Sequence, residues 1–457
     1  MPDTETTSGK LDARRSRYAL YAICFGFFLV LLDTTALNVA IASMEREFGG
    51  VISGLQWVVN SYTLVFASLL LVCGAIGDRF GSRRLYQGGL LLFTITSLFC
   101  ALSPGINFLI GLRVLQGLGA AMMLPASLSL LSHAFPKPEE RSQAVAFWAS
   151  MVSLGFAAGP VLGGVLIHYF GWRSIFWINV PVGIVAFEMV RRFVREGRSD
   201  HPRHIDWAGQ LALSLALFCV TYALIQAGKA GWAAPPILTA FTLSIALAGL
   251  FVFIERRSAS PVMPGSLFSQ PVFSICVLMG LILNFSMYGT LFIESLYLQN
   301  VRHLSALATG LMIVPFTGLP TITTRLIGKR NGNRHIKPRL LVGQIIAVVG
   351  SATLALEFWT PGYSVILLGF GLLGVAMGFI MPAMTAGVLV STPTNMSGMA
   401  SGILNSSRQV GGVLGVALMG TLMQRHLTQG LLVSFGLSVL SFLLMAVATS
   451  RLIQKRE

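Results

Sequence analysis

Several charged residues lie inside long apolar stretches of this sequence, among them Asp33, Arg113, Glu294 and Arg408. Charge within an apolar helix is costly in lipid, so such residues usually serve ion or substrate pathways. Asp33 is the deepest, more than two helical turns from either end of the stretch 19–42. Burial disfavours an ionised carboxylate, and an approaching cation favours it. Asp33 could therefore exchange a proton for a cation; the alternative is a neutral or hydrogen-bonded side chain that only packs helices.

Glu294 is the second candidate carboxylate, and Asn284 and Tyr288 precede it on one face of the same expected helix. Glu294 lies nearer the end of its apolar stretch, so a vestibule or a membrane-surface position is the alternative to a central one. Glu188 precedes two arginines by three and four residues, a spacing typical of a local structural ion pair.

Arg113 and Arg408 need polar partners inside the protein. Because arginine stays protonated, either one would tune a neighbouring carboxylate rather than carry the proton itself. A purely structural pairing with backbone carbonyl groups is the alternative.

Two segments have the residues that gates and moving helices require. Small residues at intervals of four allow close helix approach, and they occur together at Gly155, Gly159, Pro160, Gly163 and Gly164. The proline favours a bent, mobile helix, although a static helix contact would give the same spacing. A polar turn between two apolar stretches contains Gly74, Asp78, Arg79, Gly81 and Arg83. It could latch one arrangement of the helices, or it could be a plain solvated hairpin.

The composition places these residues in a membrane protein. Of 457 residues, 54% are hydrophobic and 11% are charged, against about 25% charged in soluble domains. The net charge is +15, but the basic residues lie in short loops without a basic aromatic face, which argues against nucleic-acid binding. The five cysteines form no CxxC or Cys/His cluster, so neither a disulfide framework nor a zinc site is expected.

Apolar stretches of about 20 residues cross a bilayer as helices, and fourteen are expected here. Their limits are 19–42, 54–76, 84–103, 106–132, 142–168, 172–193, 207–228, 234–254, 271–299, 305–327, 339–357, 361–390, 397–423 and 429–450. Fourteen crossings place both termini on the same side of the membrane, and 25 of the 32 lysine and arginine residues then lie on that side. The positive-inside rule then places both termini in the cytoplasm.

The first six and last six spans look like two copies of one unit. Met122–Ala126 and Ile380–Ala383 are similar proline segments, each followed by glycines, at an offset of about 257 residues; chance similarity is the alternative. Such repeats suggest a transporter whose halves rock about a central site. The expected parts are a cytoplasmic tail (1–18), a six-helix bundle (19–193), two inserted spans with cytoplasmic linkers (194–270), a second six-helix bundle (271–450) and a cytoplasmic tail (451–457).

These segments together resemble the major facilitator superfamily, and within it the fourteen-span drug:proton antiporter family. The resemblance is carried by Leu32–Ala40, Gly74–Arg84, Leu109–Ala121 and Gly155–Leu166. Two positions depart from the family pattern, since Ser82 stands where a basic residue is usual and Ala42 replaces a proline. Pro261–Pro264 and Leu404–Gln409 further resemble methylenomycin A resistance proteins.

The resemblance implies an all-α polytopic membrane protein with the major facilitator fold and fourteen transmembrane helices arranged 6+2+6. It implies a multidrug exporter driven by the proton gradient, without a cofactor, and it links Arg113 to proton transfer. The expected partners are a small-molecule substrate, protons and the lipid bilayer of a bacterial inner membrane, with the chain acting as a monomer. The residues expected to couple protons or bind substrate are Asp33, Asn38, Arg113, Asn284, Tyr288, Glu294 and Arg408.

Other functions are less well supported. An ATP-driven pump would need a phosphate-binding loop, and no GxxxxGK[ST] motif is present. An enzyme is not indicated either, because the sequence contains neither an HExxH nor a GxSxG motif. A proton-coupled uptake symporter would share the fold and Asp33, but the Gly155–Gly164 motif marks exporters in the family that the chain resembles. A dedicated exporter of one metabolite is not separated from a multidrug exporter by the sequence.

Overall fold

The computed structural model is helical throughout the part of the chain that it describes, which confirms the all-α prediction. The described residues are 3–49, 52–196, 206–258, 261, 263–330, 336–360, 362–393, 396–424 and 427–452. The helices of the first part are α1 (Asp3–Phe48), α2 (Ile52–Phe80), α3 (Ser82–Ala101), α4 (Ile106–Ala134), α5 (Pro138–Phe170), α6 (Ser174–Trp177) and α7 (Asn179–Phe193). A middle part follows with α8 (Trp207–Ala230), α9 (Pro235–Arg257) and α10 (Gly265–Phe268). The last part contains α11 (Pro271–Asn300), α12 (Ala306–Arg330), α13 (Ile336–Ala355), η1 (Leu356–Phe358), α14 (Tyr363–Val390), α15 (Ser397–Met423) and α16 (Leu427–Leu452).

Twelve helical segments in the described part are long and apolar enough to cross a membrane, with α6 and α7 counted as one segment. The two other long helices at expected spans are α3 and α15, of 20 and 27 residues. They are less apolar because α3 begins with a serine and two arginines and α15 is rich in glycine and serine. The count of fourteen spans therefore stays a prediction.

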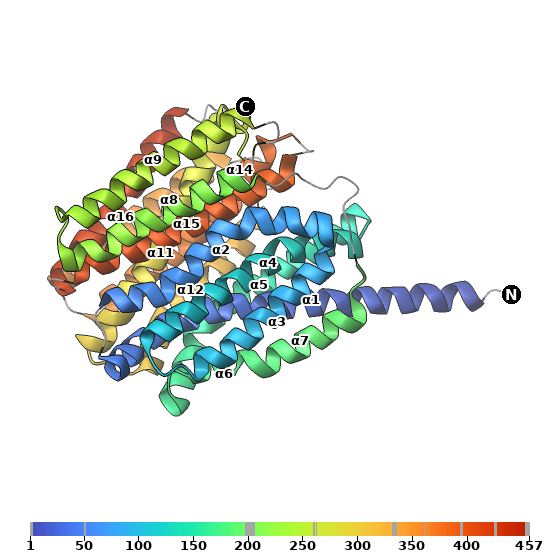
Figure 1. Cartoon of the computed structure of the whole chain (residues 1–457), viewed down its shortest axis with the longest axis horizontal. Helices are drawn as coiled ribbons and strands as arrows, with labels where there is room; N and C mark the ends of the chain where they lie inside the picture. Colours follow the sequence, from blue (N-terminus) through green and yellow to red (C-terminus); the bar gives the residue numbers. More distant parts are fainter. Residues whose placement is uncertain are drawn as a thin grey trace.

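The first and last sets of helices pack in the same pattern (Figure 1). α1 contacts α5 and α7, and α11 contacts α15 and α16. α4 lies against α2 and α3, as α14 lies against α12 and α13. We call α1–α7 the first half and α11–α16 the second half. α8 and α9 pair with each other, and α8 lies against both α2 and α15. Equivalent helices thus make equivalent contacts, as an internal repeat requires.

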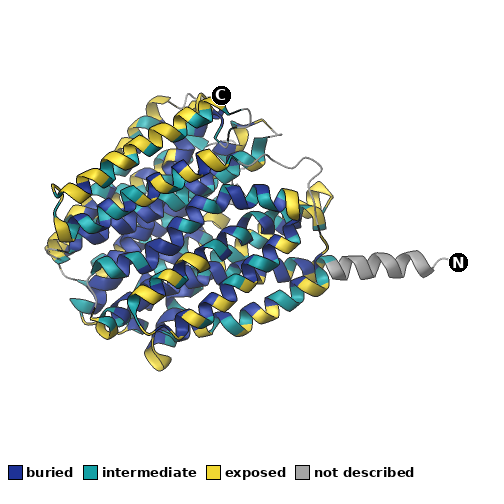
Figure 2. Cartoon of the chain, viewed as in Figure 1, coloured by how far each residue is buried: buried dark blue, intermediate teal, exposed yellow. Residues whose placement is uncertain are grey.

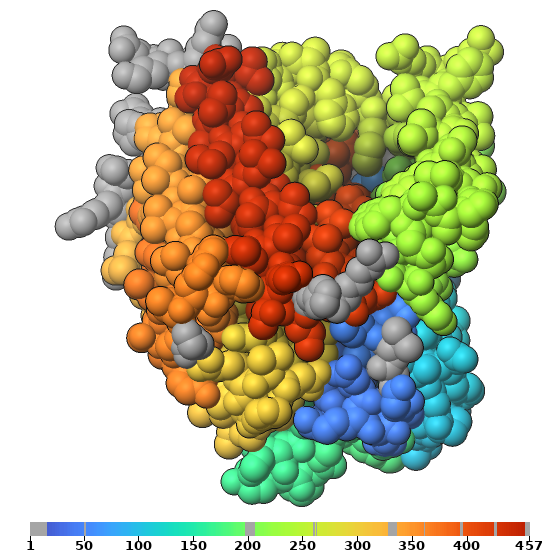
Figure 3. Space-filling model, turned by 90° about the vertical axis from the view of Figure 1, so that its left-hand side faces the viewer, coloured from blue at the N-terminus to red at the C-terminus, as the bar shows by residue number. Residues whose placement is uncertain are grey.

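Hydrogen bonds join the two halves at one end, the end where α1, α11 and α15 finish and α2 begins. Ser295 Oγ donates to the Asn38 carbonyl at 2.6 Å, and Gln299 Nε2 donates to the Val39 carbonyl at 2.9 Å. Gln56 Nε2 donates to two carbonyl groups of α15, the nearer at 2.7 Å. Figure 3 views this end and shows the first half (blue) in contact with the second (yellow and red).

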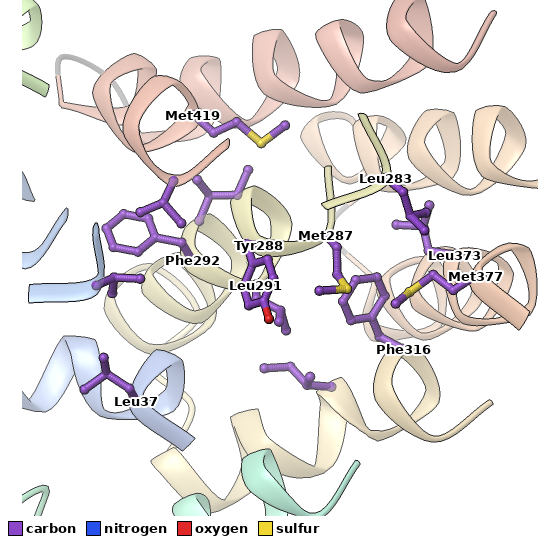
Figure 4. Packing of buried hydrophobic residues seen from close by; sticks show 14 of the residues in the cluster. Leu37, Leu283, Met287, Tyr288, Leu291, Phe292, Phe316, Leu373, Met377 and Met419 are labelled. Atoms are coloured by element: carbon purple, nitrogen blue, oxygen red, sulfur yellow. The ribbon is translucent and has the colours of Figure 1, made fainter. Parts of the chain in front are cut away.

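The apolar core divides in the same way. Leu37 of α1 belongs to one large core with Phe292 of α11 and Met419 of α15 (Figure 4). The earlier turns of α1, from Ala19 to Val30, belong to a separate core within the first half. Buried residues fill the middle of each half and exposed residues lie at the rim (Figure 2). The first-half members of the large shared core therefore lie toward the end where the hydrogen bonds lie, and a smaller cluster joins Leu64 of α2 to Val413 of α15.

Candidate functional site

Asp33 lies at the centre of a buried polar network in the first half. Its Oδ2 atom accepts a hydrogen bond from Arg113 Nη1 at 2.6 Å, which makes a buried ion pair between α1 and α4. Each residue is 1% exposed. Charges without water need both an opposite charge and hydrogen bonds to the remaining polar atoms, and this site supplies both.

Arg113 is held from three sides. Besides Asp33, its Nη1 donates to Gln116 Oε1 at 2.7 Å, and its Nε donates to the Val58 carbonyl at 3.3 Å. The guanidinium lies 4.3 Å from the ring centroid of Tyr62, a distance suited to a cation–π interaction. Arg113 and Gln116 lie on one face of α4 because they are three residues apart.

Two amides donate to the second carboxylate oxygen, and one hydroxyl binds both of these amides. Asp33 Oδ1 accepts from Asn179 Nδ2 at 3.2 Å and from Gln116 Nε2 at 3.4 Å. Ser97 Oγ lies 2.7 Å from Gln116 Nε2 and 3.2 Å from Asn179 Nδ2, and it accepts from both. Asn179 reaches this position because helix α6 ends at Trp177 and α7 begins at Asn179, inside the predicted span 172–193. Sequence reasoning missed Gln116, Asn179, Ser97 and Tyr62; only Gln116 had a signal, as the polar residue of the Leu109–Ala121 motif.

A second polar group lies in the second half. The predicted residues Tyr288 and Arg408, from α11 and α15, are within electrostatic range of each other. Asn284 is buried one turn before Tyr288. Tyr62 of α2 lies near both Asp33 and Tyr288.

Asn38 and Glu294 lie apart from the Asp33 carboxylate contacts. Asn38 Nδ2 donates to the Thr34 carbonyl of its own helix at 2.9 Å, and the Asn38 carbonyl contacts the second half. Glu294 is fully buried within α11, so the structure excludes the membrane-surface position considered for it. Its neighbour is Glu357 of η1, which sequence reasoning did not single out. Glu188 makes the expected local ion pairs with the two arginines that follow it.

The glycines of α5 bring helices into direct contact. A Cβ at Gly163 would lie 2.9 Å from Ala36 Cβ, and a Cβ at Gly159 would overlap the Thr35 side chain. Gly164 faces α12, since its Cβ would lie 2.8 Å from the Ala306 carbonyl oxygen. Gly155 and Pro160 are also buried. The motif therefore packs α5 against α1 of its own half and against α12 of the other.

The predicted gating loop between α2 and α3 is fastened to the end of α7. Gly81 has φ of 107°, a conformation suited to glycine. Glu196 Oε1 accepts from the Arg83 backbone N–H at 2.9 Å, and Arg83 Nη2 donates to the Arg191 carbonyl at 2.7 Å. Gly74 lies near Pro125 of α4. The other expected members are Arg79, which lies 5.6 Å from the ring centroid of Phe80, and Asp78, which also makes a polar contact.

Known proteins share this sequence and this fold. The family pattern of the Major Facilitator Superfamily matches residues 23–416. The methylenomycin A resistance protein of Streptomyces coelicolor is 34% identical over 95% of this chain and 92% of its own length. The multidrug resistance protein Stp of Mycobacterium tuberculosis is 33% identical over 91% of this chain and 77% of its own.

A solved structure supports the same fold. A bacterial homologue of the human lysosomal transporter Spinster, in an inward-facing and occupied conformation, has a TM-score of 0.68 at 16% identity, over 96% of this chain and 97% of that one. The long apolar helices and the bacterial relatives place this chain in a bacterial inner membrane as a multi-pass protein. These matches confirm the resemblance predicted from the motifs. The chain therefore belongs to the Major Facilitator Superfamily of membrane transporters.

Proposed function

We propose that this chain is a proton-coupled exporter of small amphipathic or cationic drugs, an antiporter that works by alternating access. The observation that carries the proposal is the buried Asp33–Arg113 ion pair. A carboxylate in such a position can lose its charge to a proton or keep it beside a cation, but it cannot bind both at once. The names of the relatives, which are resistance proteins, support drugs or antibiotics as the substrate class.

The proposal includes the topology. Addition of α3 and α15 to the twelve apolar segments gives fourteen spans in a 6+2+6 arrangement, and the basic loops favour cytoplasmic termini. The two bundles comprise residues 19–193 and 271–450, with the inserted spans between them. In this orientation the joined end of the halves faces the outside, as it would in an inward-facing state.

Proton binding at Asp33 removes the negative charge of the pair. Arg113 then keeps two hydrogen-bond acceptors, Gln116 Oε1 and the Val58 carbonyl, although its charge has lost the carboxylate that balanced it. In the inward-facing state a drug cation near Asp33 favours the ionised carboxylate, and the proton leaves to the cytoplasm. In the outward-facing state the drug leaves and a proton from outside binds Asp33. Energy comes from the proton gradient, without a cofactor.

The test is drug-driven proton movement in proteoliposomes, with a panel of cationic and neutral drugs. Asp33→Asn is expected to abolish the signal while leaving the protein folded. Glu188→Gln is the matched control, because Glu188 is a partly exposed carboxylate in a local ion pair. Unchanged coupling in Asp33→Asn would contradict the proposal. If none of the drugs in the panel elicits proton movement by the folded wild-type protein, a dedicated metabolite exporter or an uptake symporter is favoured.

A further inference from the structure

Glu294 and Glu357 form a buried carboxyl pair outside the Asp33 network. Glu294 lies on α11, six residues before its end, and Glu357 lies in η1, directly after α13. Their exposed fractions are 0% and 3%, and the two groups are neighbours. Within the described part of the chain, none of the four carboxyl oxygens has a hydrogen-bond donor in bonding geometry.

Two adjacent carboxylates cannot both stay ionised in such surroundings. Each charge has lost its water, and each repels the other. The other polar neighbours of Glu357 are Tyr297 and Arg302, both from the end of α11 and its following turn. One arginine can balance one carboxylate, so the second carboxyl group needs a cation or a proton of its own. A proton held between the two groups also supplies the hydrogen-bond donor that the oxygens lack.

The pair has a small cavity beside it. Glu357 and Tyr297 line a cavity of about 10 Å³, which has room for about one water molecule, together with Thr428, Leu431 and Phe435 near the start of α16. α13 and α16 contribute only apolar side chains and the Thr428 hydroxyl to this lining. The cavity lies toward the joined end of the molecule, because α11 and α13 end there and α16 begins there. It provides a place from which water can deliver a proton to the pair.

The same segment of α11 joins the two halves. Ser295 follows Glu294 directly, and its hydroxyl donates to the Asn38 carbonyl of α1. Gln299, one turn later, donates to the Val39 carbonyl. We propose that the Glu294–Glu357 pair is a second proton-binding site, which holds one shared proton while the halves are joined at this end. The outward orientation of this end rests on the proposed function; the binding of the proton does not.

The first test detects the shared proton directly. Infrared spectra of the purified full-length protein at neutral pH are expected to contain a carboxylic-acid C=O band from the shared proton. Exposed carboxyl groups do not contribute to this band, because they are ionised at neutral pH. Glu294→Gln with Glu357→Gln should remove this band. Asp33→Asn should leave it unchanged, so this result and the failure of the proposed function are distinguishable. A band that survives in the double variant overturns the proposal.

Two further measurements guard against misfolding and a different ligand. Each single variant, Glu294→Gln or Glu357→Gln, should keep one acid and shift the band, because the hydrogen-bond partner has changed. A band unshifted in both single variants contradicts a shared proton. Titration with Mg²⁺ or Na⁺ at neutral pH should leave the wild-type band intact. Loss of the band on addition of either ion would identify the pair as a metal-cation site instead.

Discussion

Asp33 and Arg113 have each lost their water, so the charge of one is balanced mainly by the charge of the other. Buried ion pairs of this kind add little net stability, but removal of one partner leaves an uncompensated charge. The surrounding amides are placed for the carboxylate: Asn179 and Gln116 both donate to Asp33 Oδ1. Both carboxylate oxygens of Asp33 thus accept hydrogen bonds in this conformation.

Arg113→Gln should destabilise the protein by about 3–5 kcal/mol, because Asp33 is left buried without its partner. The double variant Asp33→Asn with Arg113→Gln should recover most of that loss, since no charge is left uncompensated. Both variants should lack drug-driven proton movement. Thermal unfolding of the purified protein measures the stability, and equal losses in the single and double variants would contradict the pairing.

Sequence reasoning found the charged members of the site and missed the neutral ones. Asp33 and Arg113 stand out because charge is rare inside apolar spans. Asn179 and Ser97 do not, since one amide or hydroxyl in a span costs little and their meeting depends on how α3, α4 and α7 pack around α1. Glu357 was missed for another reason: a charge at the end of a predicted span is ordinary, and only the fold places it beside Glu294.

At the scale of helices, α5 is fitted to α1 by its glycines, and the end of α1 differs from the prediction. The span was expected to finish at residue 42, but α1 continues to Phe48. The polar residues beyond 42 end the apolar stretch without ending the helix, because they have partners. Glu45 accepts from Asn300 Nδ2 at 2.6 Å, and Glu47 forms an ion pair with Arg173. α1 is also uninterrupted at Ala42, so the absent proline leaves no break.

Gly159→Ala should lower the stability by about 1–3 kcal/mol, because the added methyl group overlaps Thr35 and forces α1 and α5 apart. Gly111→Ala is the matched control, since Gly111 of α4 has open space where its Cβ would lie. That control should be neutral or stabilising by up to about 1 kcal/mol, as expected for alanine in place of glycine in a helix. Thermal unfolding and proton movement of both variants check the difference; equal effects would contradict close packing as the role of Gly159.

At the scale of the molecule, the halves are joined at one end, and α5 is less buried toward the opposite end. Ala144 is the one buried residue of α5 before Gly155, whereas the later part of α5 is buried at the glycines and Pro160. The repeat and its two bundles could be anticipated from matching proline and glycine segments. Which end is joined could not, because both conformations of a rocking transporter use the same sequence and differ only in which contacts are made.

Gln56→Ala should favour separation of the halves at the joined end. Gln56 Nε2 donates to carbonyl groups of Val416 and Ala417, and its Oε1 accepts from Gln424. Loss of these bonds should shift the equilibrium by about 1–3 kcal/mol, roughly 5- to 150-fold. Gln344→Ala is the control, because Gln344 bonds only within the second half.

Distances between two spin labels, measured by double electron–electron resonance, check this shift. Spin labels at the exposed residues Arg46 and Thr360, in a background without the native cysteines, report the separation of the halves at the joined end. The Gln56 variant should populate a longer distance than the wild type, and the Gln344 variant should not. The same distances in all three proteins would show that Gln56 does not hold this end closed.

The contact between α5 and α12 also decides how the bilayer meets the transport path. A Cβ at Gly310 of α12 would overlap the Pro160 carbonyl of α5, so at this level the two backbones touch and no acyl chain can pass between them. The part of α5 before Gly155, from Pro138 to Leu154, is exposed along most of its length. The contact between α5 and α12 thus closes this side of the molecule at the level of Gly310, whereas few residues of α5 before Gly155 are buried. Under the proposed export function, an amphipathic compound dissolved in lipid would have to enter beside the earlier part of α5, and its concentration in lipid rather than in water would set how often it binds.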